Sequence, residues 1–326
     1  MYETKYHNSE LSNLRFLVTG GAGFIGSNLV EYLLKFGAKK VVVLDNLLTG
    51  QQSNIDLFSH HSNYQWINGD IRKPEDCEMA CNEIDIVLHQ AALGSVPRSI
   101  KDPQTTNSVN VDGFLNMLVA ARNKGVQRFV FASSSSVYGD HAALPKVEDN
   151  IGKQLSPYAV SKYSNELYAN VFSKVYGMEI IGLRYFNIFG PRQDPNGPYA
   201  AVIPLFVKHL SENSSPTIHG DGLQTRDFTF VENAVQANIK AALTENKEAF
   251  NQIFNIAVGE NFSLMDLFNE LSAILKKQIH PIHVETRSGD IRNSLADISK
   301  ANKLLDYKPV FMFKTGLEIT VKSIVQ

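Results

Sequence analysis

A glycine-rich turn between an apolar run and an amphipathic stretch limits the folds open to this chain more than any other feature. Residues 15–19 are typical of a buried strand, and from Phe24 onward apolar residues recur at helical spacing. Gly20, Gly23 and Gly26 then allow a tight turn, close approach of the backbone to a pyrophosphate, and close packing of helix on strand. Because the helix start offers free N–H groups to phosphate, the pattern predicts a dinucleotide-binding βαβ unit.

An acidic residue lies at the end of the second predicted strand, the position that is next to the ribose of a bound dinucleotide in such a unit. Asp45 closes the second predicted strand, 19 residues after the last glycine of the turn. A carboxylate there hydrogen-bonds the ribose hydroxyls and repels a 2′-phosphate, so NAD is favoured over NADP. We expect Asn46 to assist, and Asp70 and Ile71, after the third predicted strand, to reach the adenine. The alternative is that these are ordinary solvated turn residues.

Strands and helices alternate along the first 190 residues. The predicted strands are apolar on both faces, which is typical of a parallel sheet covered by helices on both sides. We therefore expect an α/β protein with a Rossmann-type, doubly wound parallel sheet. The predicted strands are 15–19, 41–44, 64–67, 84–89, 128–132 and 179–184, and the predicted helices are 24–36, 74–81, 107–124 and 156–176.

A dense run of turn-forming residues at 190–198 marks a change in the chain. We expect an NAD-binding and catalytic domain over 1–190 and a smaller α+β, substrate-binding domain over 191–326, with some segments crossing back. In the second part the predicted helices are 201–210, 233–243, 263–275 and 298–305, and the predicted strands are 217–219 and 228–231.

Tyr158 and Lys162 stand one helical turn apart at the start of the long predicted helix. At about 5 Å and an effective dielectric constant near 20, the ammonium would stabilise a phenolate by roughly 3 kcal/mol, about two pKa units. With the positive charge of an oxidised nicotinamide ring, we expect the phenol to serve as a general base near neutral pH. Residues 133–136, all serine, end the fifth predicted strand, where a hydroxyl can bond a reacting sugar oxygen.

Charge and cysteine content exclude several classes of function. The chain has 31 Lys+Arg and 33 Asp+Glu, a net charge of −2, which leaves no basic excess for nucleic-acid phosphates. Cys77 and Cys81 are too few for a zinc site, so we expect reduced thiols and no metal. The polar first 13 residues and the lack of an 18-residue apolar window predict a cytoplasmic protein without signal peptide or membrane span.

Taken together, these motifs resemble the extended short-chain dehydrogenase/reductase family, and within it the nucleotide-sugar epimerases, over about residues 14–317. Residues 92–100 and 192–197 are most similar to the bacterial UDP-N-acetylglucosamine 4-epimerases. The motifs that carry the resemblance are residues 20–26, 44–46, 89–92, 133–139, 158–162, 183–187 and 226–228.

The resemblance implies tightly held NAD and a UDP-sugar substrate whose C4 centre is inverted through a 4-keto sugar. Ser134, Tyr158 and Lys162 would be catalytic. Together with the residues derived above, the implied cofactor-binding set is Gly20, Gly23, Phe24, Ile25, Gly26, Asp45, Asn46, Gly50, Asp70, Ile71, Gln90, Ala91, Ala92, Asn110, Tyr158, Lys162, Tyr185 and Asn187. The implied substrate-binding set is Ser95, Ser134, Ser135, Ser136, Tyr158, Asn187, Gln193, Val202, His219, Arg226, Arg287, Asp290 and Ser294.

Within that set, the resemblance gives separate parts of UDP to different residues. Asn187, Arg226 and Arg287 would hold the phosphates, since the planar fork of arginine matches phosphate oxygens. Asp290 would hold the uridine ribose. The resemblance also implies a homodimer, through a four-helix contact of residues 107–124 and 156–176.

Two departures from related enzymes narrow the substrate. Dehydratases and decarboxylases of the family carry acidic residues where this chain has Ser135 and Ser136. Ser294 aligns with a bulky aromatic residue of galactose epimerases that reject N-acetyl sugars, so it would leave room for a 2-acetamido group. We therefore expect a 4-epimerase that interconverts UDP-N-acetylglucosamine and UDP-N-acetylgalactosamine.

Other functions remain open from the sequence. One is a 4-epimerase of UDP-glucose and UDP-galactose, and another is a 4-epimerase of UDP-glucuronate, whose carboxylate Arg98 or Arg192 would bind. A 4-keto sugar reductase would need exchangeable nicotinamide. A non-catalytic NAD-sensing scaffold is disfavoured because Tyr158 and Lys162 are both present.

Overall fold

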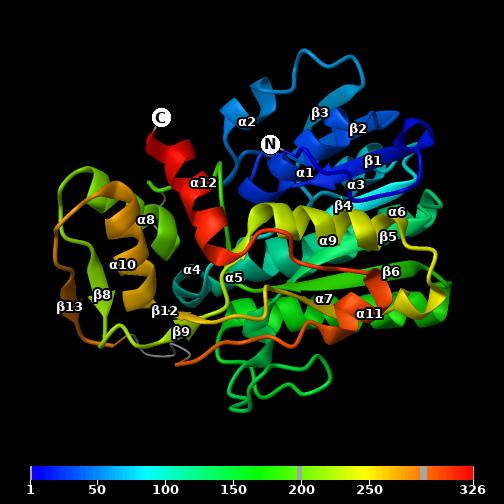
Figure 1. The fold of residues 1–326 in the computed structure, drawn as a ribbon. Coiled ribbons are helices and arrows are strands. Elements are labelled where there is room, and N and C mark those ends of the chain that lie inside the picture. Colours follow the sequence, from blue (N-terminus) through cyan, green and yellow to red (C-terminus); the bar gives the residue numbers. More distant parts are fainter. Residues whose placement is uncertain (1, 197–199, 287–291, 326) are drawn as a thin grey trace.

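The computed structural model describes residues 2–196, 200–286 and 292–325. Within them, seven parallel strands form the central sheet in the order β11-β6-β5-β4-β1-β2-β3 (Figure 1). The strand order reverses direction at β1, which confirms the predicted doubly wound α/β class. The strands are β1 (Arg15–Thr19), β2 (Lys40–Asp45), β3 (Tyr64–Asn68), β4 (Ile86–His89), β5 (Arg128–Ser134), β6 (Glu179–Tyr185) and β11 (Ile253–Ile256).

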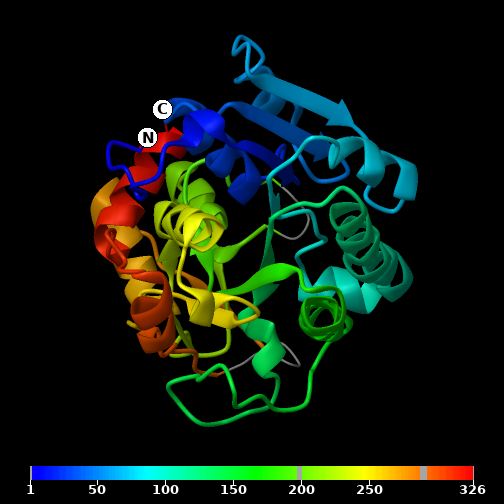
Figure 2. The same ribbon diagram turned by 90° about the vertical axis from the view of Figure 1, so that its right-hand side faces the viewer.

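Helices cover both faces of this sheet (Figure 2). On one face lie α1 (Phe24–Lys35), α9 (Val231–Leu243) and α11 (Ser299–Leu305), and on the other α3 (Pro74–Ala80), α6 (Gly113–Asn123) and α7 (Pro157–Tyr176). Successive strand residues point to opposite faces. In β1, Phe16 and Val18 pack in the core with α1 and α9, while Leu17 packs in the core with α3 and α6. Burial on both faces explains the unbroken apolar runs in the sequence.

The helix predicted at residues 107–124 begins earlier than expected. Its first turn is α5 (Pro103–Asn107), and the Asp102 side chain caps it by accepting a hydrogen bond from the Thr105 N–H at 3.0 Å. A π-helical turn, η2 (Ser108–Asp112), joins α5 to α6. The Asp-Pro pair is a helix-start signal, and it places the true beginning at Pro103.

Short elements connect the strands or cap the cavity described below. They are η1 (Leu11–Asn13), α2 (Gln52–Asp56), α4 (Val96–Lys101), η3 (Ser135–Tyr138) and η4 (Lys247–Ala249).

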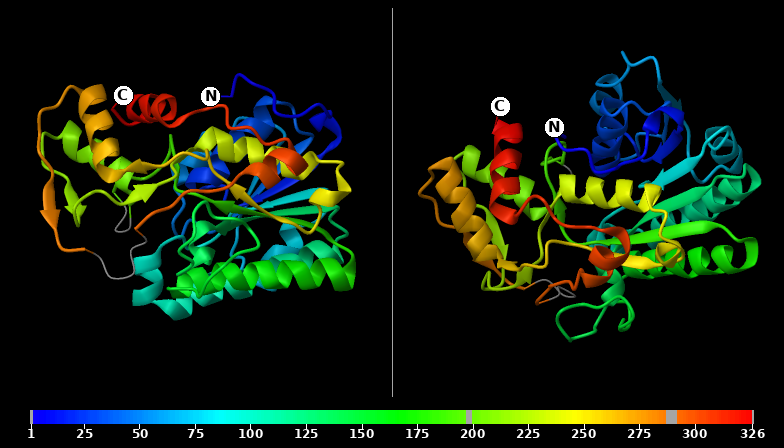
Figure 3. Two further views of the ribbon diagram at one scale, coloured as in Figure 1. Left: turned by 60° about the horizontal axis from the view of Figure 1, so that its bottom comes forward. Right: turned by 45° about the vertical axis from the view of Figure 1, so that its right-hand side comes forward.

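A smaller part of the molecule lies beside the sheet (Figure 3). Its core contains Phe206, Leu267 and Phe313, one from each of its helices. The helices are α8 (Val202–Ser211), α10 (Leu264–Leu275) and α12 (Phe313–Val325). Its strands pair as β8 (Thr217–His219) with β13 (Ile282–Val284), β9 (Thr225–Arg226) with β12 (Phe262–Ser263), and β7 (Ile188–Phe189) with β10 (Thr229–Phe230).

The chain crosses back from the smaller part into the sheet. Strand β11 adds to the sheet edge beside β6, and α9 and α11 pack on the same side. The large part therefore includes elements from beyond residue 190, among them β11, α9 and α11. Across the described ranges, none of the helices has the length and apolar character needed to cross a membrane.

Candidate active site

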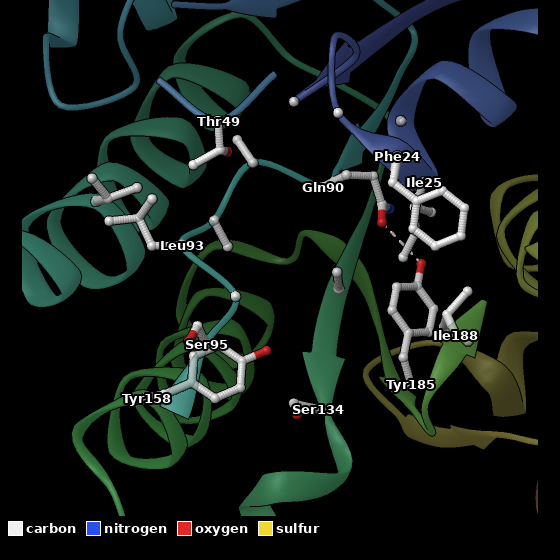
Figure 4. Close-up of a pocket in the computed structure, with 18 of the residues that line it drawn as sticks. Phe24, Ile25, Thr49, Gln90, Leu93, Ser95, Ser134, Tyr158, Tyr185 and Ile188 are labelled. Atoms are coloured by element: carbon white, nitrogen blue, oxygen red, sulfur yellow. Dashed lines mark hydrogen bonds between the residues drawn. The ribbon is translucent and has the colours of Figure 1, made fainter. Parts of the chain in front are cut away.

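A cavity of about 1400 Å³ opens at the carboxyl ends of the parallel strands. In a doubly wound sheet, ligands bind at this edge, at the point where the strand order reverses. The wall combines the ends of β1, β2, β4, β5 and β6 with residues of the smaller part, including Val202, Arg226 and Ser294. Figure 4 shows some of the side chains from the strand ends, among them Gln90, Ser134 and Tyr185.

At one end of the cavity, the glycine turn leaves its backbone exposed to a ligand. Gly20 has φ +70°, and a Cβ placed there would lie 2.8 Å from the Ala91 nitrogen. A Cβ on Gly26 would lie 2.1 Å from the Gly20 carbonyl oxygen, so the turn and helix α1 approach too closely for any side chain. No side chain caps α1, which begins at Phe24 after Gly23. Its first N–H groups are therefore suited to a pyrophosphate.

Asp45 at the end of β2 is held by the backbone of the glycine turn. Its carboxylate accepts hydrogen bonds from the Ala22 N–H at 2.9 Å and the Leu47 N–H at 2.8 Å. Burial raises the pKa of Asp45, and these two hydrogen bonds act in the opposite direction. The residue lines the cavity, so its oxygens are placed to accept from ribose hydroxyls.

Asp70, after β3, belongs to the same end of the cavity. Its carboxylate pairs with Arg72 at 2.5 Å and accepts from the Asn46 amide at 3.0 Å. The Arg72 hydrogen bond is the main cause that lowers the pKa of Asp70. Asn46, Gly50, Asp70 and Ile71 all line the cavity, so the structure brings the residues expected around the adenosine together.

The three expected catalytic residues meet where β5 ends against α7. Tyr158 from α7 and Ser134 from β5 face the same space (Figure 4). Lys162 is 2% exposed, and its Nζ donates to the Ala132 carbonyl oxygen at 2.8 Å. Ser134 Oγ accepts from the Ser136 N–H at 3.2 Å and from its hydroxyl at 2.9 Å. These contacts fix the serine and the lysine in the wall of the cavity that Tyr158 also lines.

Without the nicotinamide charge that the expectation included, burial has the largest effect on the pKa of both ionisable groups in this cluster. Burial raises the pKa of Tyr158, while a hydrogen bond with Ser134 opposes that rise. Burial also lowers the pKa of Lys162 to about 8, with Glu166 acting in the opposite direction. The predicted net lowering of the phenol's pKa is thus not a property of the chain alone, because desolvation of the phenolate outweighs the nearby polar groups.

A closed set of hydrogen bonds shapes the cavity wall beside β6. The Tyr185 hydroxyl donates to Gln90 Oε1 at 3.0 Å (Figure 4). Asn238 on α9 donates to the Tyr185 oxygen at 2.6 Å and accepts from the Gln90 amide at 3.0 Å. Tyr185 and Gln90 were expected at the cofactor, whereas Asn238 was not identified from the sequence because it lies behind them.

Arg226, Ser294 and Asn187 line the part of the cavity nearest the smaller part. The Ser294 N–H donates to the Thr225 carbonyl at 3.2 Å, which places Ser294 beside Arg226. Buried Asp227 supports this region by accepting from the Val258, Gly259 and Ala296 N–H groups at 3.0–3.3 Å. Sequence reasoning missed Asp227, although its place in the Arg226-Asp227-Phe228 motif was a signal.

Several expected site residues lie elsewhere. Asn110 is 1% exposed and bonds the Leu93 backbone and Ser161 Oγ, so it supports the wall from behind. Gln193 donates to the Ile188 carbonyl at 3.3 Å, and His219 contacts the Glu285 carbonyl at 3.1 Å. The described lining includes none of these three. Arg287 and Asp290 lie outside the described residues.

The remaining expected residues are part of the wall. The lining contains Gly20, Gly23, Phe24, Ile25, Gly26, Ala91, Ala92, Ser95, Ser135, Ser136 and Val202. It also contains apolar residues that the sequence did not single out, among them Leu93, Pro97, Ile100, Ile188 and Leu205. The sequence does not mark these residues as part of a site, because apolar residues in loops and helices are equally typical of a hydrophobic core.

The family follows from the length of the sequence match. Residues 16–257 match the model of the NAD dependent epimerase/dehydratase family. The chain belongs to this family. NAD is therefore its cofactor, and the glycine turn and Asp45 described above fit that cofactor. The Rossmann-type sheet and the Tyr158–Lys162 pair are the expected features of such an enzyme.

Relatives within the family cover nearly the whole chain. A putative UDP-glucose 4-epimerase of Methanocaldococcus jannaschii is 38% identical over 94% of this chain and 96% of its own. A structure of the UDP-N-acetylglucosamine 4-epimerase from Methanobrevibacter ruminantium with UDP-N-acetylmuramic acid has a TM-score of 0.90 at 39% identity, covering 96% and 98% of the two chains. The UDP-glucuronic acid 4-epimerase from Bacillus cereus, with UDP-glucuronic acid and NAD, has a TM-score of 0.89 at 34% identity, covering 95% and 99%.

Proposed function

We propose that this chain is an NAD-dependent 4-epimerase of UDP-hexoses that interconverts UDP-N-acetylglucosamine and UDP-N-acetylgalactosamine. One observation carries the proposal: Tyr158 and Ser134 face a single cavity that has the glycine turn at one end and Arg226 with Ser294 at the other. In that arrangement a sugar can lie with its C4 next to the nicotinamide ring and its 4-hydroxyl next to Tyr158 and Ser134. The relatives described above are epimerases of three different UDP-sugars, which supports C4 chemistry on a UDP-sugar.

Bound NAD supplies a reversible acceptor for the hydrogen at C4. Tyr158, assisted by Ser134, takes the proton of the 4-hydroxyl and, after the 4-keto sugar has turned over, returns it to the same oxygen. The centre is inverted because the hydrogen removed from C4 comes back on the opposite face of that carbon. Lys162, one turn along α7, supplies the positive charge that favours the phenolate. Arg226 and Asn187 hold the diphosphate. A sugar anchored mainly by its UDP can rotate to present both faces to the same base.

The preference for an N-acetyl sugar rests on the size of one side chain. Ser294 lines the cavity and is 9% exposed, so its small side chain borders ligand space. Arg192, one of the two arginines considered for a uronic acid carboxylate, is paired with Glu31 at 2.7 Å and bonds Asn28. That pairing disfavours Arg192 as the residue that would bind the carboxylate of UDP-glucuronate, because a second carboxylate would compete with Glu31.

An isotope experiment tests the reaction class. UDP-N-acetylglucosamine carrying deuterium at C4 is incubated with the purified protein, and the product is examined by mass spectrometry. We expect UDP-N-acetylgalactosamine that retains the deuterium, because the same hydrogen returns to C4. Loss of deuterium to solvent would contradict the proposed chemistry, and consumption of added NADH would instead indicate the reductase alternative.

We also propose a homodimer formed through α6 and α7. Helix α7 carries exposed apolar side chains at helical spacing, including Val160, Leu167, Val171 and Val175, which are 49–65% exposed. Such a stripe is typical of a helix packed against another chain. Sedimentation of the protein and of Leu167→Glu tests this, since the variant should sediment as a monomer.

A further inference from the structure

A buried ion pair lies directly behind the catalytic lysine. Glu166 follows Lys162 by one turn of α7, and its side chain is 6% exposed. Both of its oxygens accept from Arg184 on β6, at 2.8 Å each. Its Oε1 also accepts from Ser133 Oγ at 2.5 Å. A bidentate pair with a further donor fixes the carboxylate in one orientation.

The pair continues a line of polar groups that begins at the base. Tyr158, Lys162 and Glu166 recur every four residues, so they share one face of α7. This face packs on β5, where Lys162 bonds the Ala132 carbonyl and Glu166 bonds the Ser133 hydroxyl, next to Ser134. From the reacting end inward, the groups are phenol, ammonium, carboxylate and guanidinium.

We propose that Glu166, held in place by Arg184, is a positioning residue that keeps Lys162 charged and so sets the proton affinity of Tyr158. The proposal rests on the proposed function only in taking Tyr158 as the base. Burial disfavours an ammonium in this position, and a fixed carboxylate one turn away offsets that penalty. A neutral Lys162 would leave the phenolate without the positive charge that lies one helical turn away on α7.

Groups on the elements around α7 do not substitute for this carboxylate. His89 on β4 faces Lys162, but burial lowers the pKa of His89 to about 3, so it is neutral. Arg184 on β6 is itself positively charged, so its charge disfavours the charged form of Lys162. Tyr138 on η3 lies under Arg184, 4.8 Å from its guanidinium carbon, and donates to Asn255 at 2.7 Å. Glu148 uses its backbone carbonyl to bond Arg184 at 2.8 Å.

The test is a direct titration of Tyr158 in the purified protein with its cofactor and without sugar. Tyrosinate absorbance is followed against pH in the protein and in the same protein carrying Tyr158→Phe, and the difference isolates Tyr158 from the other tyrosines. In Glu166→Gln we expect the midpoint to rise by on the order of one pH unit, because a more easily neutralised ammonium at Lys162 stabilises the phenolate less. An unchanged midpoint in the folded variant would overturn the proposal.

Further variants separate positioning from folding. If Glu166→Gln does not fold because Arg184 keeps an unpaired charge, Glu166→Gln with Arg184→Met removes both charges. Because Arg184 disfavours the charged form of Lys162, its removal offsets part of the effect, so the midpoint should rise by less than in the single variant. A midpoint below that of the parent would contradict the proposal. Glu232→Gln is the matched control, since Glu232 is 4% exposed and bonds Tyr6 away from the site; its midpoint should not move. The titration needs no sugar, so an error in the proposed substrate would not affect it.

Discussion

Lys162 Nζ lies 2.8 Å from the carbonyl oxygen of Ala132, two residues before Ser134 on the same strand. This hydrogen bond ties the long helix that carries the base to the strand that carries the serine. The hydroxyls of Tyr158 and Ser134, for which we propose catalytic roles, therefore keep a fixed relation to each other across a helix–strand contact. Rigid elements hold reacting groups more accurately than loops do, which suits a site that must act on both faces of a sugar.

Replacing the base should separate chemistry from cofactor binding. Tyr158→Phe removes the hydroxyl but leaves the ring, so we expect retained NAD and turnover reduced by a factor on the order of 10³ or more. NAD released on denaturation is measured against protein, and turnover is measured by NMR. A fully active variant would remove Tyr158 from its role as base.

We expect the buried ammonium of Lys162 to lower the free energy of unfolding at neutral pH. Burial lowers the pKa of Lys162 from 10.5 to about 8, so the unfolded chain binds this proton more tightly. Its contribution to stability therefore rises as pH increases from about 8 to 10.5, and below pH 8 the buried ammonium costs up to about 3 kcal/mol. Lys162→Met should be inactive yet about 2 kcal/mol more stable to urea at neutral pH. A variant less stable than the parent would contradict this reasoning.

Removing the ribose carboxylate should weaken cofactor retention. Asp45→Ala leaves the Ala22 and Leu47 N–H groups without their acceptor and removes the partner of the ribose hydroxyls. Losing charge-assisted hydrogen bonds of about 1.5–3 kcal/mol corresponds to a roughly 10- to 100-fold weaker affinity for NAD. Equilibrium dialysis with NAD measures the change. Asp56→Ala, on the surface of α2, is a control that should bind NAD as the parent does.

The size of one side chain should control acceptance of N-acetyl sugars. Ser294→Tyr fills the space next to the sugar, so we expect turnover of UDP-galactose to be spared and that of UDP-N-acetylgalactosamine to be lost. The smaller change Ser294→Ala should leave both reactions in place. Equal loss on both substrates in the tyrosine variant would mean that Ser294 does not select the substrate.

The sequence predicted the parts of the fold that local pattern determines. The glycine turn, the strand ends and the Tyr158–Lys162 spacing all report backbone geometry directly, since each depends on residues close together in the chain. The start of the helix at Pro103 was missed only because the Asp-Pro signal was not used. These features needed no knowledge of distant contacts.

Long-range contacts explain what the sequence did not reveal. Strand β11 joins the sheet beside β6 after some 70 intervening residues, and no local pattern indicates that return. Asn238, Asp227 and Glu166 support the site through partners elsewhere in the chain, so each looks like an ordinary polar residue. Asn110 was assigned to the cofactor by resemblance, but its partners place it one layer behind the wall.

The most direct test of the central claim is proton NMR of the purified protein with UDP-N-acetylglucosamine and no added cofactor. The couplings of the proton at C4 report whether its hydroxyl is equatorial or axial. We predict that signals of UDP-N-acetylgalactosamine appear, which requires C4 inversion, retained NAD and room for the acetamido group together. An unchanged spectrum, in a protein that does convert UDP-glucose or UDP-glucuronate under the same conditions, would contradict the proposed substrate.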